Sequence, residues 1–164
     1  MTVGEAMKKM IEMSVGSRHD IDHFIKVWTY AKTIGELEGL DEKTQKTLEY
    51  AAIVHDIACP ALRAEFGSCP GIKQQELGAP MAREFYKDSG LPQDMTDRIV
   101  YLVEHHHTFK DVDGLDYQIL LEADFLVNAG EQDKYHRNIE KFRTGIFRTK
   151  TGLSLLDSVY GKED

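Results

Sequence analysis

Apolar residues recur three or four positions apart along nearly the whole chain, and this spacing is the period of an amphipathic helix. Runs with a period of two, which would indicate strands, are absent, and so is an internal repeat. The spacing predicts helices over Thr2–Met13, Asp20–Glu38, Asp41–Ile57, Ile72–Asp88, Gln93–His107 and Leu115–Asn128. The tail from Glu131 is expected to add two more helices, broken near Gly145 and Gly152. Residues 1–164 are therefore expected to form one compact all-α bundle.

The stretch 59–71 interrupts this helical pattern. It contains two prolines and two glycines, which are the residues that most often interrupt regular structure. We therefore expect an irregular loop here. A loop of this length within a small domain is more often functional than decorative.

The charge of the chain limits the classes of partner. The chain carries 28 acidic against 20 basic residues, which gives a formal net charge of −8. Proteins that bind nucleic acid without sequence preference, or that dock on anionic membranes, present a basic surface, so neither partner is expected. An anionic substrate would need local positive charge, and a bound divalent cation is one way to supply it.

The apolar segments also bear on location in the cell. The segment Met1–Met13 lacks an apolar stretch of signal-peptide length, and no stretch approaches the ~20 apolar residues of a membrane span. A cytoplasmic location is therefore expected. Cys59 and Cys69 lie ten positions apart, without the CxxC spacing of a structural zinc site. In this setting they are expected to be reduced thiols rather than a disulfide.

Four of the expected helices carry an ionisable side chain on their apolar face, because residues three and four positions apart share a helix face. These side chains are His23, His55 with the adjacent Asp56, His106 and Asp124. Burying an imidazole or a carboxylate costs several kcal/mol unless it is paired or bound to a metal. A single such histidine is usually hydrogen-bonded within a core, but four such faces in one small domain are hard to satisfy independently. We therefore interpret them as ligands of a shared divalent metal.

The ligand types narrow the choice of metal. Imidazole and carboxylate without cysteine suit Mn²⁺, Fe²⁺, Co²⁺, Ni²⁺ or Zn²⁺ better than Mg²⁺, which prefers oxygen ligands. Within the triplet of histidines at the end of the helix Gln93–His107, helical spacing places His106 on the apolar face rather than His105 or His107.

The order of these residues on successive helices resembles the HD-domain superfamily of metal-dependent phosphohydrolases. Related segments occur at Asp20–His23, Ala51–Ile57, Gly78–Arg83, Val103–His107 and Glu122–Leu126. The resemblance covers about residues 18–130, and it implies an HD-like bundle around a central metal site. Residues 131–164 would add C-terminal helices that complete this bundle.

By this resemblance, one metal ion would be held by His23, His55, Asp56 and Asp124. His106, with His105 or His107, resembles histidines that help to bind a second metal in some members. Members with two metals usually carry a histidine where this chain has Gln74, and a glutamine carbonyl is a poorer ligand for these ions. We therefore expect one metal ion and leave a second one open.

The resemblance also implies a reaction. A metal-activated water would attack the phosphorus of a small phosphorylated metabolite, which we expect to be a nucleotide. Asp56 would both bind the metal and hydrogen-bond this water. Arg18, just before the helix that carries His23, is the expected cation for the substrate phosphate.

Further substrate contacts are expected from the segment 59–71 and the residues just after it. Because this segment follows the His55-Asp56 pair directly, we expect it to form a wall of the pocket. Arg63 and Lys73 are candidates to bind the phosphate, and Glu76 is a candidate acid or base at the pocket mouth. Tyr101 and Phe109 are candidates to stack on a nucleobase.

Other functions remain open on the sequence alone. Some HD-like domains hold a redox-active di-iron centre, so a metal-dependent oxygenase is one alternative. A non-catalytic module that binds a metal or a nucleotide for regulation is another, and a helical bundle with fortuitous polar residues is a third. A homodimer is compatible with a helical domain of this size, although nothing in the sequence requires it.

Overall fold

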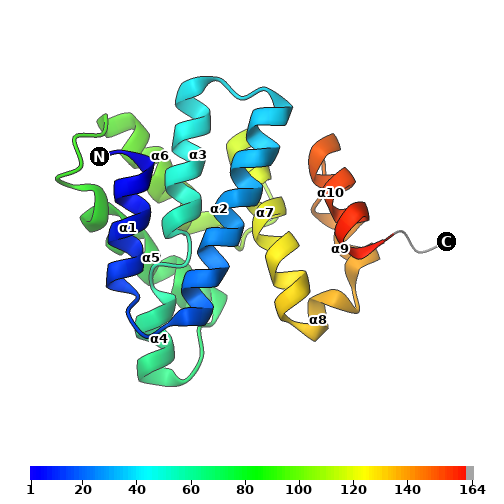
Figure 1. Cartoon of the computed structure of the whole chain (residues 1–164), viewed down its shortest axis with the longest axis horizontal. Coiled ribbons are helices and arrows are strands. Elements are labelled where there is room, and N and C mark those ends of the chain that lie inside the picture. The colour runs from blue at the N-terminus through cyan, green and yellow to red at the C-terminus, as the bar shows by residue number, and fades with distance from the viewer. Residues whose placement is uncertain (162–164) are drawn as a thin grey trace.

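Helices joined by short turns make up residues 1–161, the part of the chain that the computed structural model describes (Figure 1). Their bounds are α1 Val3–Met13, α2 Arg18–Glu38, α3 Glu42–Val54, α4 Cys59–Phe66, α5 Gly71–Tyr86, α6 Gln93–His105, α7 Leu115–Glu131, α8 Asp133–His136, α9 Ile139–Gly145 and α10 Lys150–Tyr160. The expected all-α class is confirmed. Each helix predicted before residue 129 is present, with ends that differ by a few residues.

Side chains at the helix ends explain several of these boundaries. Thr2 and Glu5 form a capping box at the start of α1, and Asp41 accepts hydrogen bonds from two backbone N–H groups in the first turn of α3. Gly39 ends α2 in the left-handed conformation, with a φ of 77°, which glycine adopts without strain. Local interactions therefore explain the starts of α1 and α3 and the end of α2.

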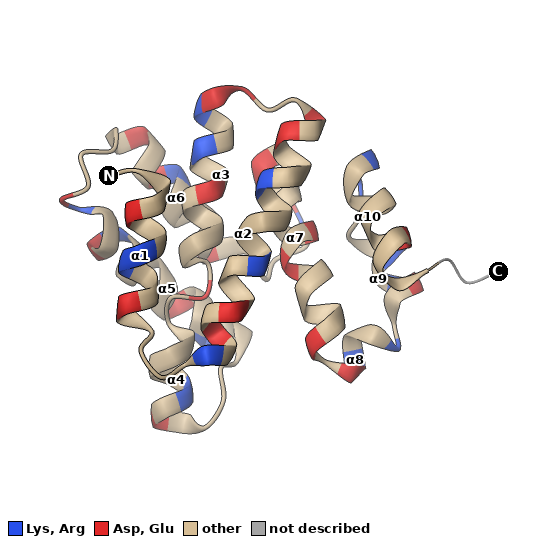
Figure 2. Cartoon of the chain, viewed as in Figure 1, with Lys and Arg blue, Asp and Glu red and all other residues tan. Residues whose placement is uncertain are grey.

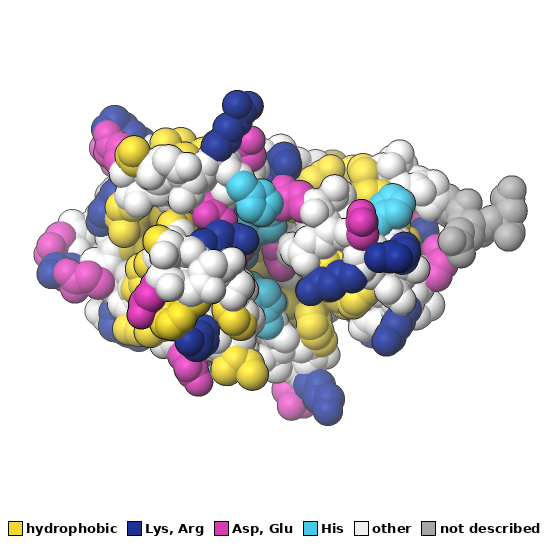
Figure 3. Space-filling model, turned by 90° about the horizontal axis from the view of Figure 1, so that it is seen from below, with side chains coloured by type: hydrophobic (Ala, Val, Ile, Leu, Met, Phe, Trp, Pro, Cys, Tyr) yellow, Lys and Arg dark blue, Asp and Glu magenta, His cyan; other side chains and the backbone are white. Residues whose placement is uncertain are grey.

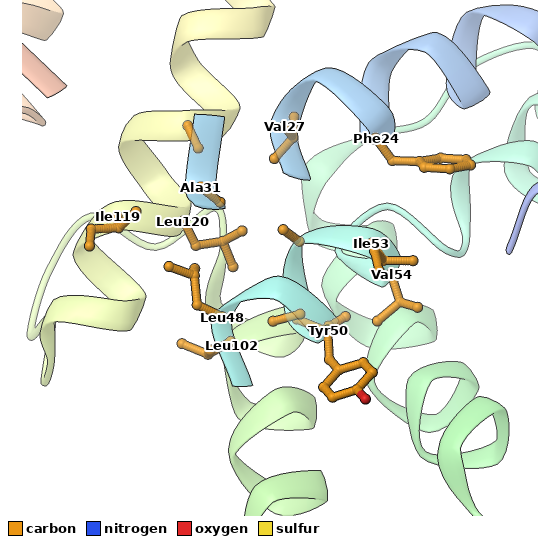
Figure 4. Close-up of a cluster of buried hydrophobic side chains, with 14 of the residues drawn as sticks. Phe24, Val27, Ala31, Leu48, Tyr50, Ile53, Val54, Leu102, Ile119 and Leu120 are labelled. Atoms are coloured by element: carbon orange, nitrogen blue, oxygen red, sulfur yellow. The ribbon is translucent and has the colours of Figure 1, made fainter. Parts of the chain in front are cut away.

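The helix α3 lies inside the bundle, where it packs against α1, α2, α6 and α7 (Figure 1). All of its residues 47–54 are buried. Figure 4 shows apolar side chains that surround it, among them Val27 from α2, Leu102 from α6 and Leu120 from α7. Because this core encloses the end of α3, it holds the following residue, His55, in a fixed position.

Charged residues are distributed over most of the helices, with acidic and basic positions on the same ribbons (Figure 2). Several form ion pairs one helical turn apart, such as Lys8 with Glu12 and Lys46 with Glu42. Of the helices between residues 1 and 161, none has both the length and the apolar character that a membrane crossing needs.

The expectation of an irregular loop over residues 59–71 is wrong for most of that segment, because residues 59–66 form α4. Pro60 lies in the first turn of α4, where its missing N–H costs nothing, and Gly67 ends the helix with a φ of 69°. Pro70 precedes α5. Prolines and glycines often interrupt helices, but in this segment Pro60 and Gly67 mark the start and the end of α4.

The tail also differs from expectation, because within the described residues it forms α8, α9 and α10 rather than two helices. Gly152 lies inside α10 instead of breaking it, and its backbone N–H donates to the capping side chain of Thr149 at 2.9 Å. A side chain at position 152 would collide with the buried carboxylate of Glu122. The glycine therefore allows α10 to approach α7 closely.

Cys59 and Cys69 form a disulfide, with Cα atoms 5.3 Å apart, so the expectation of reduced thiols is wrong. Cys59 is the first residue of α4, and the turn after Gly67 brings the chain back to it. The separation of ten residues in the sequence gives no sign of this return, because the return depends on α4 itself. The disulfide therefore ties the two ends of the α4 segment together.

We predict that reductant destabilises the wild-type protein. Opening the Cys59–Cys69 loop restores conformational entropy to the unfolded chain, which lowers the free energy of unfolding by about 2–3 kcal/mol. Chemical denaturation with and without reductant measures this difference. The variant with both Cys59→Ser and Cys69→Ser is the control and should not respond to reductant. A wild-type protein whose two thiols react with a thiol reagent before reduction would contradict the prediction.

Candidate metal centre

Ionisable side chains from four parts of the fold meet at one end of the bundle. They are His23 from α2, His55 and Asp56 from the turn after α3, His106 from the turn after α6, and Asp124 from α7. The exposed fractions are 5% for His23, 0% for His55, 1% for His106 and 7% for Asp124. The structure therefore brings together the residues that the sequence analysis expected to share a metal.

The distances within this cluster are close to the spacing of ligands around one ion. His23 Nε2 lies 3.3 Å from His55 Nε2 and 3.2 Å from Asp124 Oδ1. Asp56 Oδ2 lies 3.6 Å from His23 Nε2 and 3.8 Å from His55 Nε2. Ligand atoms that each lie about 2.1 Å from one ion are roughly 3.0–3.4 Å from one another. Small shifts of the side chains would complete such a shell.

The other ring nitrogen of each histidine is held by a hydrogen bond. His23 Nδ1 lies 2.8 Å from Glu131 Oε2, to which it donates. His55 and His106 donate through Nδ1 to backbone carbonyls three residues earlier, at 2.8 and 2.7 Å. In its neutral form each imidazole then directs the lone pair of Nε2 toward a carboxylate, and two acceptors cannot bond to each other. A cation between them would satisfy both.

Two atoms show this need directly. Asp56 Oδ1 and His106 Nε2 are both buried without a hydrogen-bond partner, although they lie only 3.3 Å apart. In addition, if all three imidazoles were neutral, the two ionised carboxylates of Asp56 and Asp124 would leave two negative charges unpaired, and buried charge needs compensation. A divalent transition metal with nitrogen and oxygen ligands fits this set of residues.

Without a metal, protons take the place of the cation. Burial lowers the pKa of His23, but hydrogen bonds to Asp124 and Glu131 and the charge of Asp56 outweigh it and raise the pKa to about 10. Burial also lowers the pKa of His106, but the adjacent Asp56 outweighs it, so the pKa of His106 is raised. Burial works to raise the pKa of Asp56, but the surrounding imidazoles lower it below its usual value, so this carboxylate is ionised. An entering metal must therefore displace protons from imidazole.

A second group of potential ligands shares Asp56 and adds His106 and His107. Gln74 limits this group. Gln74 Nε2 donates to the carbonyl of Cys69 at 2.8 Å, so its Oε1 is turned toward His107 Nε2, from which it accepts a hydrogen bond. Burial and the neighbouring His106 lower the pKa of His107 to about 4, so His107 is neutral. The hydrogen bond to Gln74 therefore engages one of the two ring nitrogens of His107, which favours one metal.

His105 lies away from the cluster. Its ring stacks on Tyr101, with 4.1 Å between the ring centroids, and its Nδ1 bonds the carbonyl of the same residue. Of the three adjacent histidines, His106 and His107 therefore face the site. The expectation that His106 points inward agrees with this placement.

A cavity of about 600 Å³ opens onto the cluster and is lined in part by His23, Asp56, Asp124 and His107. Seen from below, histidine side chains lie near the middle of this face, with Lys and Arg side chains close to them (Figure 3). Arg63 of α4 and residues 69–71 also line the cavity. The segment 59–71 thus forms part of a wall, as expected, although as a helix.

The candidate substrate contacts lie in different surroundings. Arg63 lines the cavity, and its Nε pairs with Asp20 Oδ1 at 3.0 Å. The side chain of Arg18 is 92% exposed and pairs with Asp22 rather than lining the cavity. Lys73 and Glu76 also lie outside the lining, with Lys73 placed over the ring of Phe66. Phe109 lines the cavity, whereas Tyr101 does not.

The side chains of the cavity wall that the sequence analysis missed include His19, Asn128 and Glu131. Asn128 Nδ2 donates to Asp124 Oδ1 at 2.8 Å, and Glu131 orients His23. Asp124, Asn128 and Glu131 are spaced by four and three residues, which places them on one face of α7. This signal was present in the sequence, but the helix was expected to end at Asn128, which left Glu131 in the tail.

Comparisons with known proteins agree with this arrangement. The HD domain family model matches residues 20–139, which include the whole cluster. A crystal structure of a predicted HD superfamily hydrolase from an uncultured Thermotogales bacterium is similar, with a TM-score of 0.67 at 23% sequence identity. The likeness covers 96% of this chain and 83% of that one, and at this identity it concerns the fold. No curated protein matches the chain.

We predict that metal binding releases protons. Because the pKa of His23 in the metal-free protein is about 10, His23 is protonated at pH 8, and its proton leaves when Nε2 binds metal. The apparent affinity for Mn²⁺ or Zn²⁺ therefore rises as the pH increases toward 10. Calorimetry at pH 8 in buffers with different ionisation enthalpies counts the protons and should find at least one. An affinity that stays constant from about pH 6 to 9 would contradict this linkage.

We also predict that Glu131→Gln weakens metal binding. In the wild type, the negative charge of Glu131 holds Nδ1 of His23 and makes the ring more basic. The variant removes this charge. A loss of about tenfold in affinity is expected. Glu36→Gln is the matched control. Glu36 lies at an exposed position of α2, where it pairs with Lys32, and its replacement should leave the affinity unchanged. Equal affinities of the two variants would show that Glu131 does not support the ligand.

Proposed function

The chain belongs to the HD-domain family, and on this premise we propose that it is a metal-dependent hydrolase of a phosphate ester. The substrate class that we favour is a small phosphorylated metabolite, in particular a nucleotide. The observation that carries this proposal is the cluster of His23, His55, Asp56 and Asp124, of which all but His55 line a cavity of about 600 Å³. A cavity of this size accommodates a metabolite but not a folded macromolecule.

A bound divalent ion supplies a Lewis acid for the phosphoryl oxygens and lowers the pKa of the attacking water. Asp56 is placed to orient that water, since its two carboxylate oxygens face different sides of the cluster. Oδ2 faces the imidazoles of His23 and His55, and Oδ1 faces His106. With a metal bound, Asp56 would accept a hydrogen bond from the attacking water and align it with the phosphorus.

Arg63 is the cation that we assign to the substrate phosphate, in place of Arg18. Its Nε is engaged with Asp20, and because Arg63 lines the cavity, its other guanidinium N–H groups are the ones that we expect to donate to a phosphoryl oxygen. His19 also lines the cavity, 4.0 Å from Glu131, and a ring nitrogen there can donate a proton to the leaving oxygen. These two residues would neutralise the charge that develops as the ester bond breaks.

The alternative function, a metal-dependent oxygenase, rests on Asp56, because this carboxylate is shared by the two groups of potential metal ligands. Asp56 belongs to both groups, as a residue that bridges two ions would. The hydrogen bond from His107 to Gln74 works against it, because it engages one of the two ring nitrogens that His107 could offer to a second iron. We therefore favour hydrolysis, which one ion can support.

We predict metal-dependent release of phosphate from nucleoside monophosphates by the wild-type protein. The assay tests nucleotides, sugar phosphates and an aryl phosphate with Mn²⁺, Co²⁺, Ni²⁺ and Mg²⁺ in turn. Asp56→Asn should lower kcat about 100- to 1,000-fold, because it loses both a metal ligand and the group that orients water. Asp22→Asn changes an exposed carboxylate on α2 and is the matched control, with activity close to that of the wild type.

Two results would overturn the proposal. One is phosphate release that Asp56→Asn leaves unchanged, since the cluster would then not be the active site. The other is a metal-loaded protein without turnover on the whole panel. Iron-dependent oxygen consumption would then support the oxygenase, and nucleotide binding without turnover would support a regulatory module.

A further inference from the structure

The cavity next to the metal cluster has an apolar and aromatic part. Phe125 of α7, Tyr135 of α8 and Phe142 of α9 line it, together with Leu121 and Ile146. The expected functions of metal ligation and phosphate binding use none of these side chains. Tyr135, in α8, and Phe142, in α9, lie near or beyond the end of the segment 20–139 that the family model matches.

The aromatic side chains form a continuous wall. The ring centroids of Phe125 and Phe142 are 4.5 Å apart, and those of Tyr135 and Phe142 are 5.4 Å apart. Phe125 is anchored in the core with an exposed fraction of 4%, whereas Tyr135 and Phe142 are only partly buried. The wall is therefore fixed from behind by the core and presents aromatic surface to the cavity.

The helix α7 connects this wall to the metal cluster. Asp124 belongs to the cluster and the next residue, Phe125, belongs to the wall, and both line the same cavity. A molecule whose reacting group lies at Asp124 would therefore extend its other end toward Phe125 and Phe142. Phe109, which is 52% exposed, lines the same cavity from the turn after α6.

The size of the cavity favours a substrate larger than a phosphoryl group on a short alcohol. Pockets of roughly 300–1,000 Å³ enclose ligands of drug size, so a phosphoryl group on a short alcohol would leave much of this cavity filled with water. Water against aromatic rings is unfavourable, and a flat ring stacked on them would remove it and add a directional contact. A flat, uncharged group is the complement of this wall.

We propose that the wall formed by Phe125, Tyr135 and Phe142 binds a planar aromatic group in the alcohol part of the substrate, as a nucleobase would provide. This inference rests on the proposed function, because it takes the reacting phosphate to lie at the metal cluster. Phe142 is then a residue that determines specificity. It contributes to binding of the substrate through its ring and takes no part in the cleavage of the ester.

The test compares two substrates that differ only in the planar group. Nucleoside 5′-monophosphates carry a base on ribose phosphate, and ribose 5-phosphate lacks it. We expect the wild-type protein to prefer the nucleotides at least about tenfold in kcat/KM. Phe142→Leu keeps an apolar side chain but removes the ring, so it should abolish most of this preference through KM. The kcat/KM for ribose 5-phosphate should fall much less than that for the nucleotides.

Phe66→Leu is the matched control, because Phe66 is an exposed aromatic residue outside the cavity lining. It should keep the preference of the wild type. Equal kcat/KM for both substrates in the wild type would overturn the inference. A loss in Phe142→Leu that is the same for both substrates would overturn it too, since a merely structural role produces that result. Thermal unfolding shows whether Phe142→Leu is folded. If it is not, Tyr135→Leu replaces it in the comparison.

A second measurement separates this inference from the proposed function. If the wild type cleaves none of these esters, binding of purine and pyrimidine nucleosides without phosphate is measured by saturation-transfer NMR. Binding that Phe142→Leu weakens and Phe66→Leu does not would support the aromatic site although hydrolysis fails. Absence of nucleoside binding to the wild type would overturn the aromatic site.

Discussion

The convergence of two carboxylates and three imidazoles at one buried point is the constraint on which the rest of this structure depends. Asp56 and Asp124 are almost enclosed by protein, and unpaired charge in that position would cost several kcal/mol. The imidazoles offer lone pairs rather than protons once their Nδ1 atoms are bound. Only protons or a metal ion can relieve this arrangement, and the hydrophobic core around α3 is what holds it together.

The same site is shaped by segments that are distant from the ligands in sequence. The disulfide brings Cys69 next to the start of α4, and the carbonyl of Cys69 orients Gln74, which in turn engages His107. This chain of contacts opposes a second metal and also forms one wall of the cavity. On the opposite side, α8 and α9 supply Tyr135 and Phe142. Segments far from the cluster in sequence thus form the walls of the cavity beside it.

Sequence reasoning predicted the helices and the inward-facing ligands because burial imposes a helical period on apolar residues and on the polar residues among them. It missed α4 because Pro60 and Gly67 can either interrupt a helix or delimit one, and only the packing of the chain decides. It misplaced Arg18 because spacing does not tell where a long side chain in an exposed first turn will point. The disulfide and the role of Glu131 depend on contacts across the fold, which local spacing does not encode.

Metal stoichiometry tests the central claim most directly. The protein would be loaded with Mn²⁺ or Zn²⁺, freed of excess metal and measured by elemental mass spectrometry, alongside a variant with His55→Ala. The account predicts one ion per chain in the wild type and none in the variant, since His55 is a buried ligand. A metal-free wild type of undiminished stability would contradict it. Two ions per chain would show that Gln74 does not prevent a second site.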